Sequence, residues 1–494
     1  MPSPTPELGP STVVPAGMLN SRGRPHERKL ARRIATQLED DIVRDGWDVG
    51  SVYASESELR ERYNVSRAVL REAIRLIEHR GVAVMRRGPY GGLILQEPDA
   101  APLTAAVVVY MEYVGATVED VLSARLLLEP LASRLAAEHI NEGQVATLRQ
   151  VLIAERSYGA VETSKREHLH RTLATLSGNP ALGVFIEVLS QLTVRYGTAP
   201  RTPGSEATAL SAQSDAIRGS IVEAVVAGDV SVAERRTVRH LQAIRDWMLS
   251  ARQHPIDRAG AAPDYASSEK VKLAERVAWQ LLEDIATSGS TPGAVFGSEP
   301  ELQARFGVSR AVFREAVRLL EYHGIARMRR GPAGGLIITE PSPAACIDSM
   351  AIYLEFQRVR SDQLREVRVA IETGIVESIV QRIEEPRVQR ALQECLRVKI
   401  GTARDEIGPL SLDFHFQLAR IAGNPILSHF LEILVNVWDR HSKRSAHELM
   451  DDEQISEAVD RAHSSIVEAM MGKDASLARR RMVKHLGALD QWWE

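Results

Sequence analysis

The sequence predicts a mainly α-helical protein that consists of one unit present twice. The first observation is a repeated stretch, Val65–Glu78 (VSRAVLREAIRLIE), which returns as Val308–Glu321 (VSRAVFREAVRLLE) with 11 of 14 positions identical. The second is the long segment after each copy, where apolar residues recur at helical spacing. The third is that these helical segments also match each other, since H-x-x-L-A-x-x-x-G-N-P occurs at 170–180 and at 415–425. A repeat of this length indicates duplication of the whole unit.

Composition narrows the class of protein. The 494 residues carry a formal net charge of −4, which argues against a globally basic coat for nucleic acid. The two cysteines, Cys346 and Cys395, cannot form a disulfide framework and suit a reducing cytoplasm. No uninterrupted apolar stretch approaches the length of a membrane span. Residues 1–25 are rich in Pro, Ser and Thr and predict a disordered tail rather than a secretory signal.

Each repeated stretch predicts the second helix of a helix-turn-helix. Ser66 and Ser309 are good N-cap residues, and apolar residues follow at helical spacing. An arginine row four residues apart shares one face of each helix: Arg67, Arg71 and Arg75 in the first copy, and Arg310, Arg314 and Arg318 in the second. Taken in isolation, such a row is also typical of a solvated charge face on an ordinary amphipathic helix.

The flanking residues favour DNA binding. Upstream, Ser55 with Glu58 forms a capping box that starts a short helix, and that helix ends at Asn64, which tolerates a left-handed turn. Ser298, Glu301 and Gly307 repeat the pattern. Downstream, 82–98 and 325–341 read as two β-strands around a Gly/Pro turn with a basic tip, which is a wing. A short helix, a tight turn, an arginine-bearing helix and a basic wing together predict a winged helix-turn-helix.

These residues resemble the GntR family of transcription regulators, whose pattern is PSE-x-x-LA…VSR-x-x-VREAL-x-x-L, over about 70 residues in each copy. The resemblance implies that the recognition helix and the wing tip contact operator DNA. The residues concerned are Ser66, Arg67, Arg71, Arg75, Arg87 and Gly88, and Ser309, Arg310, Arg314, Arg318, Arg330 and Gly331. The family often has Arg directly after the Glu of its SE motif, where this chain has Ser57 and Pro300. We therefore expect groove entry with an unusual base preference.

The expected organisation follows the chain in order. The domains are a tail (1–25), a first winged helix-turn-helix (26–98), a first helical domain (99–252), a linker (253–266), a second winged helix-turn-helix (267–341) and a second helical domain (342–494). A winged helix followed by this all-helical pattern resembles the FadR subfamily, whose C-terminal domain is called FCD. The resemblance implies antiparallel bundles that bind a small effector, commonly a carboxylate, and often hold a divalent metal through an Asp and three His.

In the second half the three metal positions of the resemblance fall on His415, His463 and His485, but the Asp position is Ser411. Three imidazoles can hold Zn²⁺ or Ni²⁺, with water or an effector carboxylate completing the shell. The alternative is three inherited polar core histidines without a metal.

In the first half only His170 and His240 remain, with Arg166 and Arg218 at the other two positions, so no metal is expected there. We hypothesise that this arginine pair clamps an anionic effector directly, and the alternative is a degenerate sensor kept as a scaffold.

The family's arginine on the first FCD helix corresponds to Arg125 and Arg368. The resemblance implies that it faces the effector. The alternative is a helix pair with Glu129 or Glu372 at i+4.

The expected function is that of a cytoplasmic, ligand-responsive transcription regulator that binds double-stranded DNA. Because one chain carries two heads, we expect a covalent pseudo-dimer on a near-palindromic operator, with further homodimerisation left open. Two rivals belong to other classes. A metal-dependent enzyme would use the His415, His463 and His485 cluster but lacks a general base in helical register. A non-specific architectural DNA-binding protein would need a broad basic surface.

Overall fold

The computed structural model describes residues 25–88, 91–157, 167–197, 205–250, 273–322, 324–329, 331, 334–340, 343–396, 404–442 and 452–493. The predicted tail up to residue 24, the predicted linker, Arg166 and Arg330 lie outside these residues, whereas Pro25 begins the first helix. The described residues form two compact units, one up to Glu97 and one from Pro98 onward.

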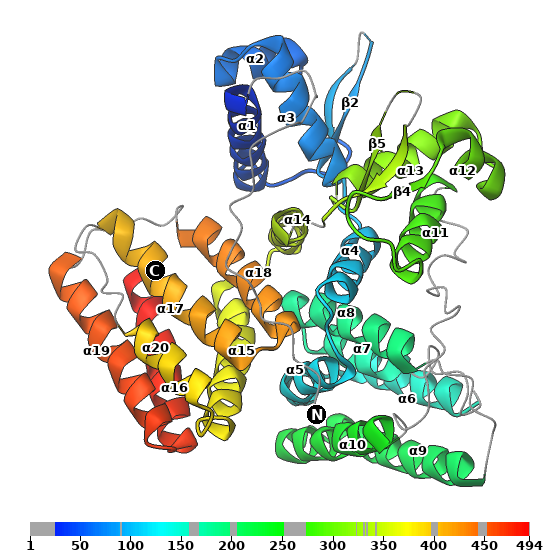
Figure 1. Cartoon of the computed structure of the whole chain (residues 1–494). Coiled ribbons are helices and arrows are strands. Elements are labelled where there is room, and N and C mark those ends of the chain that lie inside the picture. Colours follow the sequence, from blue (N-terminus) through cyan, green and yellow to red (C-terminus); the bar gives the residue numbers. More distant parts are fainter. Residues whose placement is uncertain are drawn as a thin grey trace, which may run out of the picture. The chain divides into compact units, whose positions relative to one another are not determined.

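The first unit is a winged helix (Figure 1). Its elements are α1 (Pro25–Arg44), β1 (Val52–Ala54), α2 (Glu56–Tyr63), α3 (Arg67–His79), β2 (Ala83–Arg86) and β3 (Gly92–Leu95). Leu38 and Ile42 of α1 pack in the core with Leu70 and Ile77 of α3. A buried ion pair also joins these helices, since Arg80 Nη1 lies 2.6 Å from Glu39 Oε1. The apolar face and the buried pair together fix the helix that carries the arginine row.

Each wing is a three-stranded antiparallel sheet rather than the two-stranded hairpin expected from sequence. In the first unit the strand order is β1-β3-β2, with Val52 opposite Ile94 and Val84 opposite Ile94 on the other side. The second winged helix repeats this order. The additional strand covers only three residues, too few to show a period of two. The two predicted wing strands are confirmed in both copies.

The second unit contains the first bundle, the second winged helix and the second bundle. The first bundle comprises α4 (Ala100–Tyr113), α5 (Val118–His139), α6 (Glu142–Ser157), α7 (His168–Leu176), α8 (Pro180–Gly197), α9 (Ser205–Val226) and α10 (Val230–Ser250). The second winged helix comprises α11 (Leu273–Thr287), β4 (Val295–Gly297), α12 (Glu299–Phe306), α13 (Arg310–Tyr322), β5 (Ala326–Arg329) and β6 (Gly335–Ile338). The second bundle comprises α14 (Pro343–Phe356), α15 (Ser361–Gln381), α16 (Pro386–Cys395), α17 (Arg404–Ala422), α18 (Pro425–Ser442), α19 (Asp452–Met471) and α20 (Ala475–Trp493).

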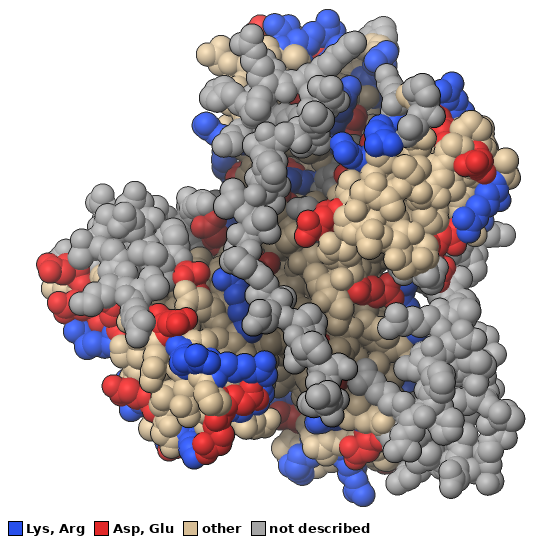
Figure 2. All heavy atoms as spheres, viewed as in Figure 1, with Lys and Arg blue, Asp and Glu red and all other residues tan. Residues whose placement is uncertain are grey.

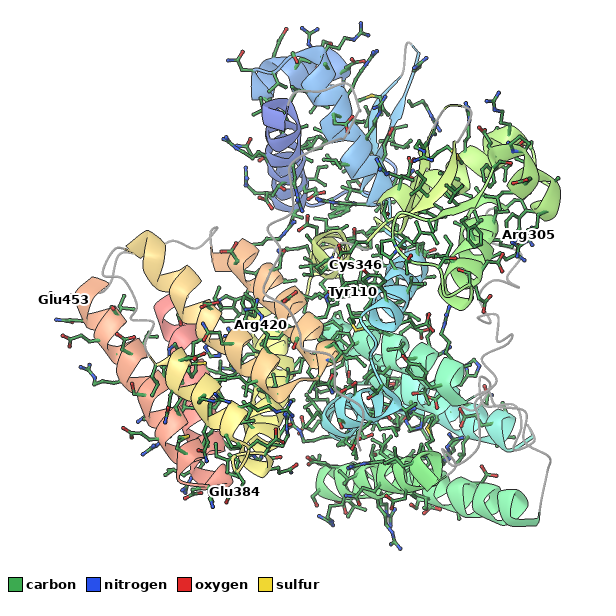
Figure 3. The ribbon with its side chains drawn as sticks, viewed as in Figure 1. Tyr110, Arg305, Cys346, Glu384, Arg420 and Glu453 are labelled. Atoms are coloured by element: carbon green, nitrogen blue, oxygen red, sulfur yellow. The ribbon has the colours of Figure 1, made fainter. Side chains whose placement is uncertain are left out.

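The two bundles share one hydrophobic core. Helices α4, α5 and α8 contribute to it from the first bundle, and α14, α15 and α18 contribute from the second. Phe185 and Phe430, which occupy equivalent positions in the repeats, stack with ring centroids 4.0 Å apart. In Figure 3, Tyr110 of α4 and Cys346 of α14 lie close together where these helices pack. The bundles therefore associate face to face within one chain.

Reciprocal hydrogen bonds give this association approximate two-fold symmetry. Asn179 Nδ2 donates to the carbonyl oxygen of Gln363 at 2.9 Å, and Asn424 Nδ2 donates to the carbonyl oxygen of Asp120 at 2.9 Å. Asn179 and Asn424 are equivalent in the repeats, and so are Asp120 and Gln363. A contact that is made twice with its partners exchanged is the signature of an isologous interface.

Helix α4 also belongs to a second core. Ala105 and Val109 pack with the buried residues of the second winged helix, including Val277 and Leu281 of α11. One helix of the first half thus contacts both the paired bundles and the second head. Among the helices of the described part of the chain, none combines the length and the apolar character needed to cross a lipid bilayer.

Candidate functional site

The predicted helix-turn-helix is present in both heads. In the first, Ser55 caps α2 and forms a capping box with Glu58, and Asn64 ends the helix at φ 47°. Ser66 then caps α3 by accepting a hydrogen bond from Val69 N at 3.3 Å. The second head repeats these features at Ser298, Glu301, Gly307 (φ 63°) and Ser309. The turn that these residues predict between the two helices is therefore present in both heads.

A glutamate in α2 holds the first arginines of α3. Glu56 Oε1 lies 2.8 Å from Arg67 Nε and 3.4 Å from Arg71 Nε. Both arginine side chains remain more than half exposed, at 61% and 53%. The hydrogen bond from Arg67, with the charges of both arginines, lowers the pKa of Glu56. The carboxylate thus orients two guanidinium groups that stay accessible to a DNA backbone or base edge.

The second head has the same arrangement. Glu299 Oε1 lies 3.0 Å from the Nε atoms of both Arg310 and Arg314, and the hydrogen bond from Arg310 is the largest cause of the lowered pKa of Glu299. Neither glutamate was singled out from the sequence. A carboxylate that follows the N-cap serine reads as part of the helix start, and its reach to α3 depends on the turn geometry.

The remaining predicted DNA-contacting residues lie on the same heads. Arg75 and Arg318 are exposed on α3 and α13, and Arg75 Nη1 pairs with Glu72 at 3.1 Å. At the wing tips Arg87 is exposed, and Gly88 and Gly331 adopt φ 120° and 113°, which disfavour other residues. Figure 2 shows Lys and Arg side chains at the upper edge of the first head.

Three histidines converge inside the second bundle. His415 of α17, His463 of α19 and His485 of α20 are at most 5% exposed. The Nε2 atom of His485 lies 3.2 Å from that of His415 and 3.1 Å from that of His463. Ligand nitrogens on tetrahedral zinc, at about 2.0–2.1 Å from the metal, lie about 3.3 Å apart. The spacing therefore fits a zinc-like ion.

Burial favours the neutral form of two of these histidines. Desolvation, reinforced by the neighbouring histidine, lowers the pKa of His485 to about 3 and lowers that of His463 well below its usual value. A neutral imidazole has a lone pair for a metal, which a protonated one lacks. The site is thus prepared for metal binding at neutral pH.

A buried carboxylate orients the first histidine. Glu372 Oε2 contacts His415 Nδ1, and Glu372 Oε1 accepts a hydrogen bond from Arg368 Nε at 2.6 Å. Burial alone would raise the pKa of Glu372, but the charges of His415 and Arg368 outweigh it and lower the pKa to about 2. A carboxylate on Nδ1 leaves Nε2 directed at the other two histidines, as in many zinc sites.

Two buried polar atoms next to this cluster have no hydrogen-bond partner among the described residues. They are Arg368 Nη2 and the Oγ of Ser411, which stands one helical turn before His415. Asp413 does not replace the expected carboxylate, because its side chain accepts from Gln417 Nε2 at 2.5 Å. Unpaired buried donors are costly, so these two atoms are candidate partners for a polar group from outside the described residues.

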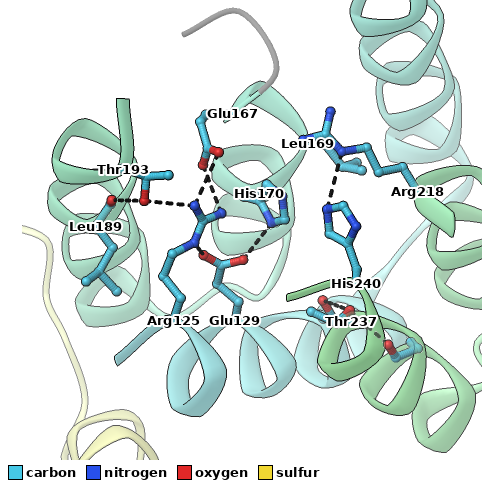
Figure 4. A network of polar contacts seen from close by, with 12 residues as sticks. Arg125, Glu129, Glu167, Leu169, His170, Leu189, Thr193, Arg218, Thr237 and His240 are labelled. Carbon is cyan, nitrogen blue, oxygen red and sulfur yellow. Dashed lines mark hydrogen bonds and ion pairs between the residues drawn. The ribbon is translucent and has the colours of Figure 1, made fainter. Parts of the chain in front are cut away.

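The corresponding place in the first bundle is filled by the chain's own charges (Figure 4). Arg125 Nε lies 2.5 Å from Glu129 Oε1, its Nη2 lies 2.9 Å from Glu167 Oε2, and its Nη1 donates to Thr193 Oγ1 at 2.8 Å. His170 Nδ1 is 2.6 Å from Glu129 Oε2. Burial would raise the pKa of Glu129, but Arg125 and His170 lower it to about 2. The positive charge of Arg125 is therefore compensated by carboxylates of the same bundle.

Arg218 is also engaged. Its Nη1 lies 3.2 Å from Glu155 Oε2, and its Nε donates to His240 Nε2 at 3.4 Å. The other oxygen of Glu155 accepts from the backbone N–H of Leu169 at 2.7 Å. Burial outweighs the charge of Arg218 and raises the pKa of Glu155. The proposed clamp partner, Arg166, lies outside the described residues.

The two bundles differ at one decisive pair of equivalent positions. Glu167, which neutralises Arg125, corresponds to Leu412 in the second half, where Arg368 Nη2 is left without a hydrogen-bond partner among the residues described. The helix pairs Arg125–Glu129 and Arg368–Glu372, considered as the alternative to effector binding, are both present. Sequence reasoning missed Glu155 and Glu167 because their partners are 42 or more residues distant and no local pattern links them.

Comparisons with known proteins find two kinds of domain in the chain, and each kind is present twice. The FCD domain matches residues 120–243 and 363–488, and the model of "Bacterial regulatory proteins, gntR family" matches residues 30–89 and 273–333. The two FCD matches together span about half of the chain.

Each of the relatives compared corresponds to about half of this chain. The Exu regulon transcriptional regulator of Escherichia coli (strain K12) is 26% identical over 225 residues, covering 44% of this chain and 83% of that protein. The HTH-type transcriptional repressor NanR of Salmonella schwarzengrund (strain CVM19633) is 27% identical over 230 residues, covering 45% and 86%. Among solved structures, Streptococcus agalactiae GntR gives a TM-score of 0.32 at 22% identity, over 44% of this chain and 99% of that chain.

Proposed function

Since the chain belongs to the gntR family of bacterial regulatory proteins and carries two FCD domains, it is a DNA-binding transcription regulator, and we propose that a single chain reads both halves of one operator. The observation that carries this proposal is the isologous pairing of the two bundles within one chain, shown by the Phe185–Phe430 stack and the reciprocal asparagine bonds. A two-fold pair of sensor domains with two attached heads is what a half-length relative obtains by dimerisation.

Linkage in one chain favours this arrangement. Once one head is bound, the second head is present at a high effective concentration, so two weak half-site contacts combine into one strong one. The heads differ in sequence, and therefore a near-palindromic operator suits them better than a perfect palindrome. Because the protein acts on DNA, the proposed location is the cytoplasm, where bacterial DNA lies.

The second bundle is the proposed sensor. His415, His463 and His485 would hold one divalent ion, Zn²⁺ or Ni²⁺, and Glu372 would keep His415 in the required tautomer. A bound ion would supply positive charge and an open coordination position for an oxygen ligand. Arg368 would complete the site by giving its unpartnered Nη2 to a small carboxylate effector.

The first bundle is proposed to be a scaffold rather than a second sensor. Arg125 and Arg218 already face Glu129, Glu167 and Glu155, so an incoming anion would have to displace a buried carboxylate. This supports the scaffold alternative over the arginine clamp. The metal-dependent enzyme is not favoured, because the family and the relatives compared are transcription regulators.

Helix α4 offers a route from the paired bundles to a head. It packs with α8 and α14 in the shared core and, through Ala105 and Val109, with the second winged helix. A small shift of α14 on effector binding would therefore move a helix that the second head rests on. We propose that the effector acts by this route, and that the protein represses transcription as the relative NanR does by name.

Sedimentation of the chain with a duplex from its own promoter region tests the operator proposal. One chain per duplex is the expected result, and two chains per duplex with one head engaged on each would overturn it. Calorimetry with Zn²⁺ tests the sensor. We expect one site per chain, lost in His463→Ala and retained in His170→Ala, and two equal sites would contradict the assignment of the first bundle as scaffold.

A further inference from the structure

The interface between the two bundles contains a leucine that fits only against glycine. Helices α5 and α15 pack across it, and Leu127 of α5 lies over Gly374 of α15. A Cβ atom built on Gly374 would lie 2.7 Å from Leu127 Cδ2, 3.0 Å from Cγ and closer still to Cδ1. Glycine in a helix interior costs about 1 kcal/mol relative to alanine. Its presence here therefore has a packing reason.

The approximate two-fold axis doubles this contact. Residues of α5 and α15 correspond at an offset of 243, so that Leu127 corresponds to Ala370, and Leu131 to Gly374. The symmetry mate of the Leu127–Gly374 contact is then Leu131 against Ala370. Leu131 is buried in the shared core, and Ala370 packs against that core. The first half supplies the large residue at both contacts, and the second half supplies the small residue at both.

Pairing of like halves would break this fit. Two first halves would set Leu127 against Leu131 twice, where the backbone separation allows only Ala or Gly opposite leucine. Two second halves would set Ala370 against Gly374 twice and leave two voids. Overpacking and voids are both destabilising in a close-packed core.

A polar contact adds a second, independent difference. Gln363 Nε2 donates to the carbonyl oxygen of Gly178 at 2.8 Å. The equivalent of Gln363 in the first half is Asp120, whose carboxylate cannot donate and already accepts from Thr117. Two first halves would therefore lack this hydrogen bond, because neither has a donor at the position of Gln363.

We propose that this interface is heterospecific, so that a first half pairs with a second half and excludes its own kind. The knobs are Leu127 and Leu131, and the holes are Ala370 and Gly374. The chain thereby closes on itself, instead of pairing through like halves with other copies. Specificity of this kind rests on steric conflict in the wrong pair as well as on fit in the right one. The inference builds on the pseudo-dimer proposed above but concerns the interface alone.

The direct test uses the whole chain with a protease site placed within residues 253–266. The folded chain is cut there, unfolded in urea and refolded, and native mass spectrometry separates the three pairings because the two halves differ in mass. We expect mixed pairs to exceed each like pair by about tenfold or more. The four-residue swap L127A/L131G/A370L/G374L should preserve this preference, whereas L127A/L131G alone should reduce it. A statistical mixture from the unaltered chain would overturn the proposal.

Intact-chain variants provide a second measurement that needs no refolding of separated halves. Gly374→Ala should lower the urea midpoint, and adding Leu127→Ala should recover part of the loss. The matched control is Gly487→Ala in α20, where an added Cβ meets nothing within 4 Å, and its midpoint should rise. Equal effects at Gly374 and Gly487 would contradict the fit. Neither assay contains DNA, so these results are separate from the number of chains that bind one operator.

Discussion

At the scale of single residues, the arginines of the heads and of the bundle interiors are paired with carboxylates in three different ways. In the heads this pairing is exposed, with Glu56 and Glu299 each holding two arginines. In the first bundle it is buried and complete, and in the second bundle Arg368 keeps only Glu372. Glutamates therefore orient exposed arginines in the heads and neutralise a buried arginine in the first bundle. In the proposed sensor, where the additional glutamate is absent, Arg368 keeps a nitrogen for a ligand.

Replacing the orienting glutamates should weaken discrimination more than binding itself. In Glu56→Gln/Glu299→Gln the arginines lose a charged partner, while a negative charge near the DNA backbone is removed. We expect the ratio of operator to random-duplex affinity to fall by about threefold to tenfold, as expected for loss of a partly exposed charge-assisted contact. Fluorescence anisotropy at one salt concentration measures both affinities. Glu72→Gln, which frees only Arg75, is the control, and an unchanged ratio would refute the orienting role.

A buried histidine at the bundle interface should make stability depend on pH. His429 of α18 lies against Tyr110 with tilted rings whose centroids are 5.0 Å apart, and desolvation lowers its pKa to about 3. Neither ring nitrogen has a hydrogen-bond partner among the described residues. The folded state therefore resists protonation, whereas the unfolded state takes up a proton near pH 6.5. This contribution to stability is fully present above pH 6.5 and is lost as the pH falls from there toward 3.

His429→Val, which introduces the residue found at the equivalent position 184, should flatten that dependence. Between pH 7 and pH 5 the wild type should lose about 2 kcal/mol more of unfolding free energy than the variant, at about 1.4 kcal/mol per pH unit below 6.5. Urea unfolding in the presence of a chelator at both pH values gives the difference. Identical pH slopes for the two proteins would show that His429 does not titrate in this way.

At the scale of elements, the N-terminus of α7 brings together two glutamates that pair with buried arginines. Glu167 occupies the N-cap position but makes no capping hydrogen bond, because its carboxylate turns toward Arg125. Glu155 of α6 takes over by accepting from the N–H of Leu169, close to the positive end of the helix dipole. Two carboxylates at one helix start thus neutralise the arginines of the first bundle. The local sequence of α7 shows nothing of this, because both partners come from other helices.

Removing one carboxylate from the buried network around Arg125 should lower the free energy of unfolding. Glu167→Leu, which gives the first bundle the residue of the second, leaves Arg125 with one carboxylate in a buried site. We expect a loss of about 3–5 kcal/mol in unfolding free energy, because an uncompensated charge is left in the interior. Urea unfolding measures the loss, and acetate at high concentration should restore part of it. Leu412→Ala in the second bundle is the control for a changed side chain without a changed charge, and a mild effect of Glu167→Leu would argue against a tightly closed network.

At the scale of the whole molecule, duplication converts a symmetric dimer into one chain whose two halves are free to diverge. The heads kept their arginine rows, the bundles kept their pairing surface, and the three equivalent histidines occur together in the second half only. In the proposed function one responsive bundle suffices, because the two bundles share a core.

Both heads should be needed for one operator. Arg67→Ala/Arg71→Ala and Arg310→Ala/Arg314→Ala should each lower affinity for the full operator by about a hundredfold or more, because the linked second contact is lost. Each should also reduce the dependence of the logarithm of affinity on the logarithm of salt concentration. Arg134→Ala, in the exposed Arg134–Glu138 pair of α5, is the control. If only one double variant weakens binding, the other head does not engage the operator.

The sequence by itself determined the elements that local rules govern. Capping boxes, left-handed turn residues and the period of the apolar residues were enough for the two helix-turn-helix motifs, the wings and the helical bundles, since each depends on residues within one or two turns. The resemblance of the helical segments to the FadR subfamily identified the three histidines. Only the tertiary structure decided the rest: the third strand of each wing, the glutamates that hold the arginines of α3 and α13, the closed network of the first bundle and the fit of Leu127 against Gly374. These depend on contacts between segments far apart in the chain, where burial and distance fix the energy of a charge or a methyl group and no local pattern records them.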